Sequence, residues 1–357
     1  GSHDWENQYV DGSWTYSLEA VWDGMQDCYA SLVADVDQRF FCIPRTFRAI
    51  GVSAMMHGYL AFDDRGELLV PFRTWRNTST GPAAEALSRL FGGAVPLRWS
   101  VAHYLQAILD DEPHVANVAS LTTLAGYVHR ALTGRHVLGI GDASGMFPID
   151  AAARDYDARL LRVFDERAGA SRPGTRLGEL LPTVLCAGEE AGRLTDQGAS
   201  LLDPAGFLRP GIAMCPPEGD AGTGMVATNT VAPRTANVSV GTSIFAMVVL
   251  DEPLAAVPDA LDVVATPVGD PVVMVHCNNG ASELAAWAGI FGRFAAAAGT
   301  PLVVLDIAIA QARFALEGDA FKVGRAPDND IDRVMHTDID ARQRDCHDRA
   351  AGRGGAA

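Results

Sequence analysis

The sequence predicts an α/β protein, and three observations support that prediction. Continuous apolar strands are expected at 244–250 and 271–276, and the second leads through CNNG, residues 277–280, into a segment with helical spacing. Strands that alternate with helices along a chain are typical of α/β folds. A length of 357 residues allows two domains with hydrophobic cores, and 48% hydrophobic with 20% charged residues is an ordinary composition for a globular protein.

The first elements expected are a long helix and a strand–loop–strand unit. The helix covers 17–33, with Ser17 as its N-cap. Residues 47–63 should form a strand, a tight loop and a second strand, followed by a turn at 63–66 and a return strand at 67–72. The apolar positions that predict the helix are Leu18, Val21, Trp22, Met25, Tyr29 and Leu32.

Two further helices are expected at 83–91 and 114–132. The second should end at Gly134, because glycine readily adopts the backbone conformation of a helix C-terminus. Its apolar face comprises Leu121, Leu124, Val128 and Leu132.

The stretch before the first apolar strand predicts its partner strand. Ala236, Val238 and Val240 alternate with small polar residues, which is the pattern of a half-buried strand. A turn at 241–243 then leads into the apolar strand. The helix that follows the strand at 271–276 is expected to bury Leu284, Trp287, Ile290, Phe291 and Phe294.

Composition and missing motifs exclude several classes of protein. Lys322 is the only lysine, so a P-loop, which requires GxxxxGK[ST], is excluded and Schiff-base chemistry is disfavoured. A net charge of −16 disfavours nucleic acid or an anionic membrane as a partner. Six cysteines without a CxxC pair indicate buried thiols in a reducing cytosol. No signal peptide, long apolar run, HExxH or GxSxG is present in the sequence.

One pair of carboxyl groups lies where the backbone carries the smallest side chains. In PPEGDAGTGMVATN, residues 216–229, Glu218 and Asp220 stand among glycines, alanines and threonines. Glycines let another molecule approach the main chain closely, and small hydroxyl residues offer donors. Asp220 could therefore be a general base for a substrate hydroxyl, or it could cap a turn.

Other stretches carry residue types that bind sugars. His57 follows a strand directly and could hydrogen-bond a polar substrate, or it could be a structural histidine of the loop. FRTWRNTST, residues 72–80, combines an indole, a guanidinium and an amide. An aromatic face can cover the C–H side of a sugar while Arg and Asn bond its hydroxyls. The alternative is that Thr78 or Thr80 only caps the next helix; RWSVAH, residues 98–103, has the same mixture and the same two interpretations.

Two glycine-containing stretches are candidate phosphate sites. GIGDASG, residues 139–145, fails the dinucleotide pattern GxGxxG because Ser144 replaces the last glycine. The turn formed by Gly241, Thr242 and Ser243 offers free N–H groups and two hydroxyls, which can form an anion nest, although it could also be a bare hairpin turn.

Seven stretches, taken together and in order, resemble the FGGY carbohydrate kinases, most closely their xylulokinase-like branch. The resemblance runs from about residue 1 to residue 300, and the ordered string is far more specific than any single motif. The stretches are GVSAMMHGYLAFD (51–63), PFRTWRNTST (71–80), LTTLAGYVHRALTG (121–134), GIGDASGMFPID (139–150), PPEGDAGTGMVATN (216–229), NVSVGTSIFAMVV (237–249) and HCNNGASELAAW (276–287).

The resemblance implies an actin-like fold, in which two domains of ribonuclease-H type hold ATP and the sugar in the cleft between them. It implies that Asp220 is the catalytic base, which takes the hydroxyl proton as the γ-phosphoryl group is transferred, with ATP and Mg²⁺ as cofactors. It assigns Gly241, Thr242 and Ser243 to the phosphates. The residues that it assigns to the sugar are Met56, His57, Trp75, Arg76, Asn77 and Glu218, with Asn77 where xylulokinases commonly have Asp.

The sequence departs from the family pattern at both ends. The family begins with a strand pair that carries a DxGT phosphate loop, and the match starts after that loop. We therefore expect an incomplete fold with a sugar-binding first domain at 1–229, which lacks its first strands. The start of a nucleotide-binding second domain is expected at 230–300, and a divergent, partly disordered tail rich in Asp, Arg and Ala at 301–357.

Two functions follow as expectations. The first is ATP-dependent phosphorylation of a pentulose- or hexulose-type sugar in the cytoplasm, and the second is sugar binding by a catalytically incomplete fragment of such a kinase. The expected partner is a small-molecule sugar, and neither nucleic acid nor a membrane is expected. No metal site is expected on the chain itself, and a homodimer is compatible with the resemblance.

Overall fold

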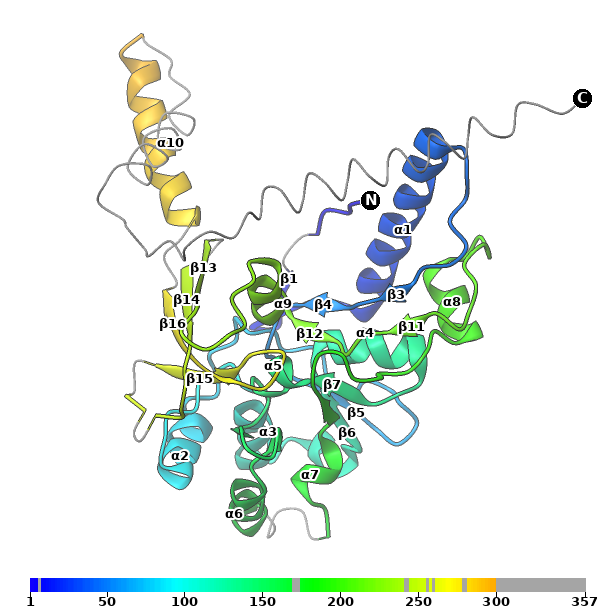
Figure 1. The fold of residues 1–357 in the computed structure, drawn as a ribbon. Helices are drawn as coiled ribbons and strands as arrows, with labels where there is room; N and C mark the ends of the chain where they lie inside the picture. Colours follow the sequence, from blue (N-terminus) through cyan, green and yellow to red (C-terminus); the bar gives the residue numbers. More distant parts are fainter. Residues whose placement is uncertain are drawn as a thin grey trace, which may run out of the picture. The chain divides into compact units, whose positions relative to one another are not determined.

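Strands and helices mix throughout the larger unit of the protein (Figure 1), which confirms the predicted α/β class. The computed structural model describes residues 1–5, 8–168, 174–240, 244–254, 257–258, 261–277 and 281–299. Contacts divide the chain into two units, Gly1–Ser282 and Glu283–Ala357, and each is described by itself. In the described part of the chain, no helix is both long enough and apolar enough to cross a membrane.

Most strands are short, and the helices vary from one turn to more than six. The strands are β1 (Gln8–Val10), β2 (Ser13–Thr15), β3 (Ala49–Ile50), β4 (Ser53–Ala54), β5 (Leu60–Phe62), β6 (Ser120–Thr122), β7 (Val137–Gly139), β8 (Ile149–Asp150), β9 (Asp155–Tyr156), β10 (Thr183–Leu185), β11 (Ala213–Met214), β12 (Glu218–Gly219), β13 (Ala236–Val240), β14 (Ile244–Val249), β15 (Asp262–Ala265) and β16 (Pro271–Cys277). The helices are α1 (Leu18–Phe40), α2 (Gly81–Phe91), α3 (Ser100–Leu109), α4 (Leu124–Thr133), α5 (Ile140–Ala143), α6 (Ala158–Ala168), α7 (Leu177–Leu180), α8 (Asp196–Leu202), α9 (Asp220–Ala227) and α10 (Ala281–Ala297), with a 3-10 helix at Pro113–Asn117.

Three parallel strand pairs bring together segments that are far apart in the sequence. β3 pairs with β11, β4 with β12, and β7 with β10. In the second pair Glu218 lies opposite Ser53 and Gly219 lies opposite Ala54. The ends of parallel strands meet at the same edge, so the loop that follows β4 lies beside the start of α9.

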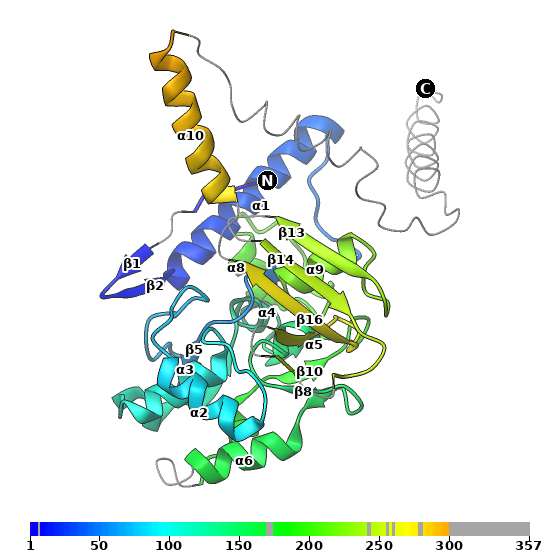
Figure 2. The ribbon, with the colours of Figure 1, turned by 90° about the vertical axis from the view of Figure 1, so that its left-hand side faces the viewer.

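An antiparallel sheet in the order β13–β14–β16–β15 forms the other part of this unit, and β13, β14 and β16 can be followed side by side in Figure 2. The strand expected at 236–240 forms, but the prediction that its apolar residues are the buried ones was wrong: Ala236 and Val238 are exposed and Asn237 is buried. Asn237 and Ser239 lie opposite Met247 and Phe245 of β14, so the polar residues share the face that packs inward. Successive side chains of a strand point to opposite faces. One face therefore carries three cross-strand pairs of β14 and β16, which are Phe245–His276, Met247–Met274 and Val249–Val272.

This face of the sheet packs against the loop after β4 and against α9. Met247, Val249, Val272 and Met274 are buried there. The same hydrophobic cluster contains Met56, Ala221 and Met225. The packing places side chains from both ends of the unit around one space, which becomes the candidate site.

The first helix begins where the sequence predicted. The Ser17 Oγ accepts a hydrogen bond from the Ala20 N–H at 3.0 Å, so Ser17 is the N-cap of α1. The expected stop at Gly134 is also confirmed, since this residue caps α4 with a φ of +74°.

The helix expected over 114–132 is only partly formed, and its first half was predicted wrongly. The strand β6 lies within this range and pairs antiparallel with β5. The helix α4 starts only at Leu124, because the Thr123 Oγ1 accepts a hydrogen bond from the Gly126 N–H at 3.3 Å and so caps it. Leu121 fits the helical spacing by coincidence, since it belongs to the strand.

The return strand expected at 67–72 is reduced to isolated bridges between Phe62 and Leu68 and between Tyr59 and Arg73. Pro71 explains the interruption, because proline has no N–H to donate to a ladder.

The helix after β16 forms as α10, but the prediction that its large apolar residues are buried was wrong for four of them. Trp287, Ile290, Phe291 and Phe294 are exposed. Apolar spacing identifies a helix and its apolar side without showing what covers that side. The tail at 301–357 lies outside the described residues.

Candidate active site

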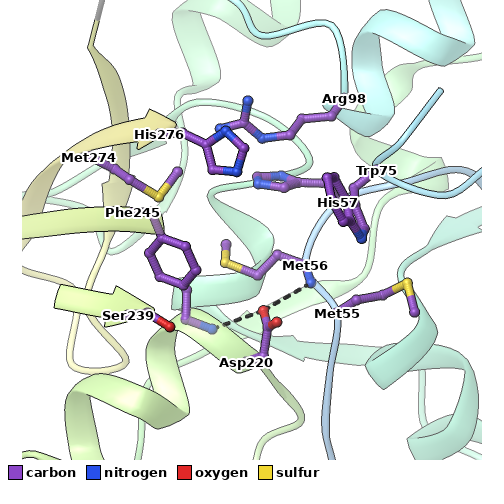
Figure 3. Close-up of a pocket in the computed structure, with 11 residues that line it drawn as sticks. Met55, Met56, His57, Trp75, Arg98, Asp220, Ser239, Phe245, Met274 and His276 are labelled. Atoms are coloured by element: carbon purple, nitrogen blue, oxygen red, sulfur yellow. Dashed lines mark hydrogen bonds between the residues drawn. The ribbon is translucent and has the colours of Figure 1, made fainter. Parts of the chain in front are cut away.

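A pocket of about 230 Å³ opens where the antiparallel sheet, the loop after β4 and the start of α9 meet (Figure 3). It draws on chain segments that are far apart in the sequence. Its lining residues are Met55, Met56, His57, Trp75, Arg98, Asp220, Ala221, Ser239, Phe245, Met274 and His276. Of the residues predicted to bind the sugar or act on it, Met56, His57, Trp75 and Asp220 are brought together here.

Asp220 presents its carboxylate to this pocket from the first residue of α9. Its Oδ1 accepts hydrogen bonds from the Ala221 N–H at 2.9 Å and from the Met56 N–H at 3.3 Å. In the described ranges no protein donor bonds Oδ2. The residue as a whole is exposed, so this oxygen can be reached from the pocket. Loss of water around the group raises the pKa of the Asp220 carboxyl, and the two backbone donors oppose this rise. One oxygen is thus fixed and the other is available to a ligand.

Gly219 is required where α9 approaches the loop after β4. A Cβ atom at this position would lie 2.0 Å from the Met56 Cγ, which is closer than two carbon atoms can approach. The absence of a side chain therefore allows the Met56 N–H to reach Asp220. This is the close backbone approach that the small residues of 216–229 suggested.

His57 lies buried in the pocket wall, with a φ of +67°. Its Nδ1 lies 3.2 Å from the Gly145 carbonyl oxygen. Burial, and secondarily the nearby Arg98 cation, hold the pKa of His57 well below its usual value. A carbonyl can only accept, so Nδ1 carries the proton of the neutral ring and Nε2 is left as an acceptor.

Arg98 and His276 form the end of the pocket away from Asp220 (Figure 3). The Arg98 guanidinium makes an ion pair with Asp262, and both side chains are largely buried. Burial and the Arg98 cation lower the pKa of His276. The Asp262 carboxylate compensates the charge of Arg98. Because their lowered pKa values favour the neutral rings, His57 and His276 add no charge beside this pair.

Two aromatic side chains form the apolar walls of the pocket. Phe245 and His276 lie directly opposite each other in the β14–β16 register, and their rings stack at a centroid distance of 6.4 Å. The Trp75 indole meets the His276 ring edge-on, also at 6.4 Å. Aromatic faces beside a carboxylate, a guanidinium and an imidazole acceptor suit a ligand with C–H faces and several hydroxyl groups.

Glu218 lies behind the pocket and is not one of the residues that line it. It is buried, and its two oxygens accept hydrogen bonds from the Gly141 N–H at 3.1 Å and the Asp142 N–H at 2.9 Å. Burial raises the pKa of Glu218 to about 7. The backbone N–H groups of Gly141, Asp142 and Gly219 favour the ionised form and oppose this rise. Its geometry fixes the β12 strand to the start of α5, and the sugar-binding role given to it stays a prediction.

Asp142 is a second buried acid that the sequence did not assign to the site. It is fully buried, and its Oδ2 accepts a hydrogen bond from the Thr123 Oγ1 at 2.6 Å. Burial raises the pKa of Asp142 well above its ordinary value, and the neighbouring Glu218 and Asp220 carboxylates add to the rise. Asp142 lies in GIGDASGMFPID, one of the stretches that carry the family resemblance, but nothing in that stretch predicted a role for it.

Arg76 and Asn77, both predicted to bind sugar, are also not among the lining residues. The Asn77 Oδ1 accepts from the Trp14 N–H at 2.9 Å, and its Nδ2 donates to the Trp14 carbonyl at 2.8 Å and to the Thr74 carbonyl at 3.1 Å. The Arg76 guanidinium lies over the Trp14 and Trp75 rings. Both residues therefore connect the β1–β2 hairpin to the segment that carries Trp75.

The predicted phosphate turn, Gly241–Ser243, lies outside the described residues. The strands β13 and β14 on either side of it pair as expected. Within the described ranges, no group of three or more His, Cys, Asp or Glu side chains could hold a metal ion.

Arg98, Phe245, Met274 and His276 are pocket residues that the sequence did not assign. Arg98 lies in RWSVAH, which had been noted for its mixture of residue types. The two strand residues Phe245 and His276 gave no local signal, because their meeting depends on the pairing of β14 with β16.

Fold and pocket together define an α/β protein with a site suited to a polyhydroxylated small molecule. The description "FGGY family of carbohydrate kinases, N-terminal domain" matches residues 6–205, more than half of the chain. The chain belongs to the FGGY family of carbohydrate kinases, as the order of its motifs predicted.

Individual relatives are similar to the chain at low sequence identity. Xylulose kinase from Haemophilus influenzae is 23% identical over 232 residues, which cover 60% of this chain and 43% of that protein. The crystal structure of ligand-bound xylulose kinase from Lactobacillus acidophilus has a TM-score of 0.66 at 16% identity and covers 85% of this chain and 59% of its own. Gluconate kinase from the same organism has a TM-score of 0.63 at 17% identity, over 81% of this chain and 55% of its own.

These structural matches show that the fold is that of the FGGY sugar kinases, the actin-like architecture expected from the sequence. The chain spans about half the length of the relatives that it matches. The activity of the whole proteins is therefore carried over only as a proposal.

Proposed function

We propose that the pocket binds a pentulose- or hexulose-type sugar and that Asp220 is the general base for phosphorylation of one of its hydroxyl groups. The observation that supports this proposal most directly is the Asp220 carboxylate, which has one oxygen held by two backbone N–H groups and the other free toward the pocket. A raised pKa makes this carboxylate a stronger base than an ordinary aspartate.

The reaction requires one proton to leave the sugar hydroxyl as its oxygen attacks. Asp220 accepts that proton at Oδ2 while the hydroxyl oxygen forms a bond to the γ-phosphorus of ATP and the bond to the ADP oxygen breaks. Oδ1 stays fixed by Ala221 and Met56, so the base keeps its orientation as the proton moves. ADP and the phosphosugar are the products.

The remaining pocket residues orient the sugar. His57 would accept a hydroxyl hydrogen bond at Nε2, and Arg98 would donate to an oxygen at the far end of the molecule. The Trp75 and Phe245 rings would cover the C–H faces. Such fixed contacts hold the attacking oxygen close to the phosphorus, which is the main way in which kinases accelerate phosphoryl transfer.

ATP supplies the phosphoryl group, and Mg²⁺ neutralises charge on its phosphates. Mg²⁺ sites in kinases commonly use one or two carboxylates together with water and the phosphates. Asp220 is the one carboxylate that lines the described pocket, and its Oδ2 is the proposed base, so Mg²⁺ would be held mainly by the phosphates of ATP and by water. A nucleotide-binding role for 230–300, the division at 229, a cytoplasmic location and a homodimer all remain predictions.

The test compares the wild-type chain with Asp220→Asn. Coupled assays of ATP consumption and calorimetric titration should be run with D-xylulose, D-fructose and D-gluconate. We expect kcat to fall by at least ~10² while the sugar Kd changes only a few-fold, as for loss of a general base. Asp196→Asn is a matched control, because Asp196 is also the exposed first residue of a helix, α8.

The outcomes separate the two functions. Sugar binding without ATP consumption by the wild-type chain would support the alternative, a sugar-binding fragment without catalysis. Activity that survives intact in Asp220→Asn would refute the assigned base. Absence of both sugar binding and turnover in the wild-type chain would overturn the proposed site.

A further inference from the structure

Arg76 is a cation held between two indole rings beside the pocket. Its guanidinium carbon lies 5.0 Å from the centroid of the Trp14 ring and 5.3 Å from that of the Trp75 ring. No carboxylate in the described part of the chain makes an ion pair with it. Cation–π contact with both rings is therefore its main interaction.

Trp14, one of the two rings, belongs to the β1–β2 hairpin, and residues 74–77 fix the position of this hairpin. Asn77 bonds both the N–H and the carbonyl of Trp14. The Thr74 N–H donates to the same carbonyl at 3.1 Å. Tyr9, on the other strand of the hairpin, packs against the Trp14 ring at 4.9 Å. The Trp14 ring is thus held in place by its own backbone and by its neighbour.

The inner ring of the stack is the pocket wall. Trp75 lines the pocket and meets the His276 ring edge-on. It is only half-buried, so packing alone leaves its side chain room to change rotamer. The Arg76 guanidinium lies over its ring and connects it to Trp14.

We propose that Trp14 and Arg76 are positioning residues, which hold the Trp75 indole at the pocket and so set the affinity for the sugar. This inference rests on the proposed function for the identity of the ligand. It replaces a direct contact of Arg76 with the sugar by an effect through Trp75. The β1–β2 hairpin thereby influences sugar affinity, although none of its residues lines the described pocket.

The experiment uses Trp14→Ala, Arg76→Ala and the double variant, with D-xylulose as the ligand. Each single substitution should raise the Kd and the KM by about 3- to 10-fold, the range that corresponds to loss of a cation–π contact, and should change kcat much less. The double variant should be no worse than either single variant, because both interrupt one chain of contacts. Trp14→Phe keeps an aromatic face and should restore most of the affinity.

Arg45→Ala is the matched control. Arg45 lies over the Phe207 ring at 6.0 Å, so this variant also removes an Arg–aromatic contact but leaves the hairpin intact. It should leave both the Kd and the KM unchanged. A Trp14→Ala variant with wild-type affinity, or a double variant whose effects simply add, would overturn the proposal in favour of direct contact by Arg76.

A second measurement separates this inference from the proposed function. The indole N–H resonance of Trp75, assigned with Trp75→Phe, reports the ring position without any sugar. It should shift or broaden in Trp14→Ala and Arg76→Ala and stay in place in Arg45→Ala. If wild-type protein binds no D-xylulose but the resonance responds as stated, the positioning role stands while the proposed function fails. An unmoved resonance in both variants would refute the positioning role.

Discussion

Replacing Glu218 by Gln should remove a loss of stability that the protein otherwise suffers as the pH rises from about 4.5 to about 7. Burial raises the pKa of Glu218 from its ordinary 4.5 to about 7 in the folded protein. Between these values the folded state holds a proton that the unfolded state has released. The contribution of the protonated Glu218 to the free energy of unfolding is therefore fully present below pH 4.5. It falls through this interval and is lost above the folded pKa.

The size of the effect follows from the interval between the two pKa values. Each pKa unit represents about 1.4 kcal/mol, so the whole interval corresponds to about 3 kcal/mol, most of it between pH 5 and pH 8. Solvent does not screen this contribution appreciably, because the side chain is buried against Gly141 and Asp142. Glutamine cannot ionise, but its amide nitrogen cannot accept a hydrogen bond either, so one of the two backbone N–H groups that bond Glu218 loses its acceptor at every pH.

Urea denaturation of wild-type protein and Glu218→Gln at pH 5, 6, 7 and 8 measures this difference. The lost acceptor should lower the stability of the variant by about 1–3 kcal/mol at every pH, and the variant should gain about 2–3 kcal/mol relative to wild type between pH 5 and pH 8. Glu85→Gln, at an exposed glutamate of α2, is measured alongside as a control for the loss of one carboxyl group. A Glu218→Gln difference that stays constant from pH 5 to pH 8 would refute the raised pKa.

Two further predictions concern the backbone near the site and the first helix. Gly219→Ala places a methyl group 2.0 Å from the Met56 Cγ, so either the Met56 side chain or the start of α9 must move. Both changes alter the pocket next to Asp220, and kcat should fall at least ~10-fold. Gly224→Ala on the same helix, where a Cβ meets nothing, should keep the wild-type kcat. Ser17→Ala removes the acceptor for the Ala20 N–H and should lower the free energy of unfolding by about 1 kcal/mol; an unchanged urea midpoint would show that the cap does not stabilise the protein.

The parts of the site predicted from sequence are those that a short stretch encodes by itself. Small residues around Asp220 indicated a close backbone approach, and Gly219 makes that approach to Met56. His57 lies in the short loop between β4 and β5, and this loop could be located for the same local reason. The family resemblance then joined these stretches, which no local pattern could do.

The rest could not be predicted because it depends on contacts between distant segments. Phe245 and His276 meet only through the register of β14 and β16. Glu218 and Asp220 look equivalent in the sequence, yet the first turns to the backbone of α5 and the second to the pocket. Trp75, Arg76 and Asn77 are consecutive, but only the first reaches the pocket. Residue type alone does not determine which way a side chain faces.

The pairing of Phe245 with His276 has a consequence for how such a pocket changes under mutation. Both rings occupy the same rung of an antiparallel ladder, and every second residue of each strand shares their face. A slip of one residue in β16 would turn its whole pocket-facing set to the opposite side. The set of β14 and β16 side chains that faces the pocket is therefore determined together, by the register of the two strands. Single substitutions can adjust its surface gradually, whereas an insertion or deletion within either strand would replace it in one step.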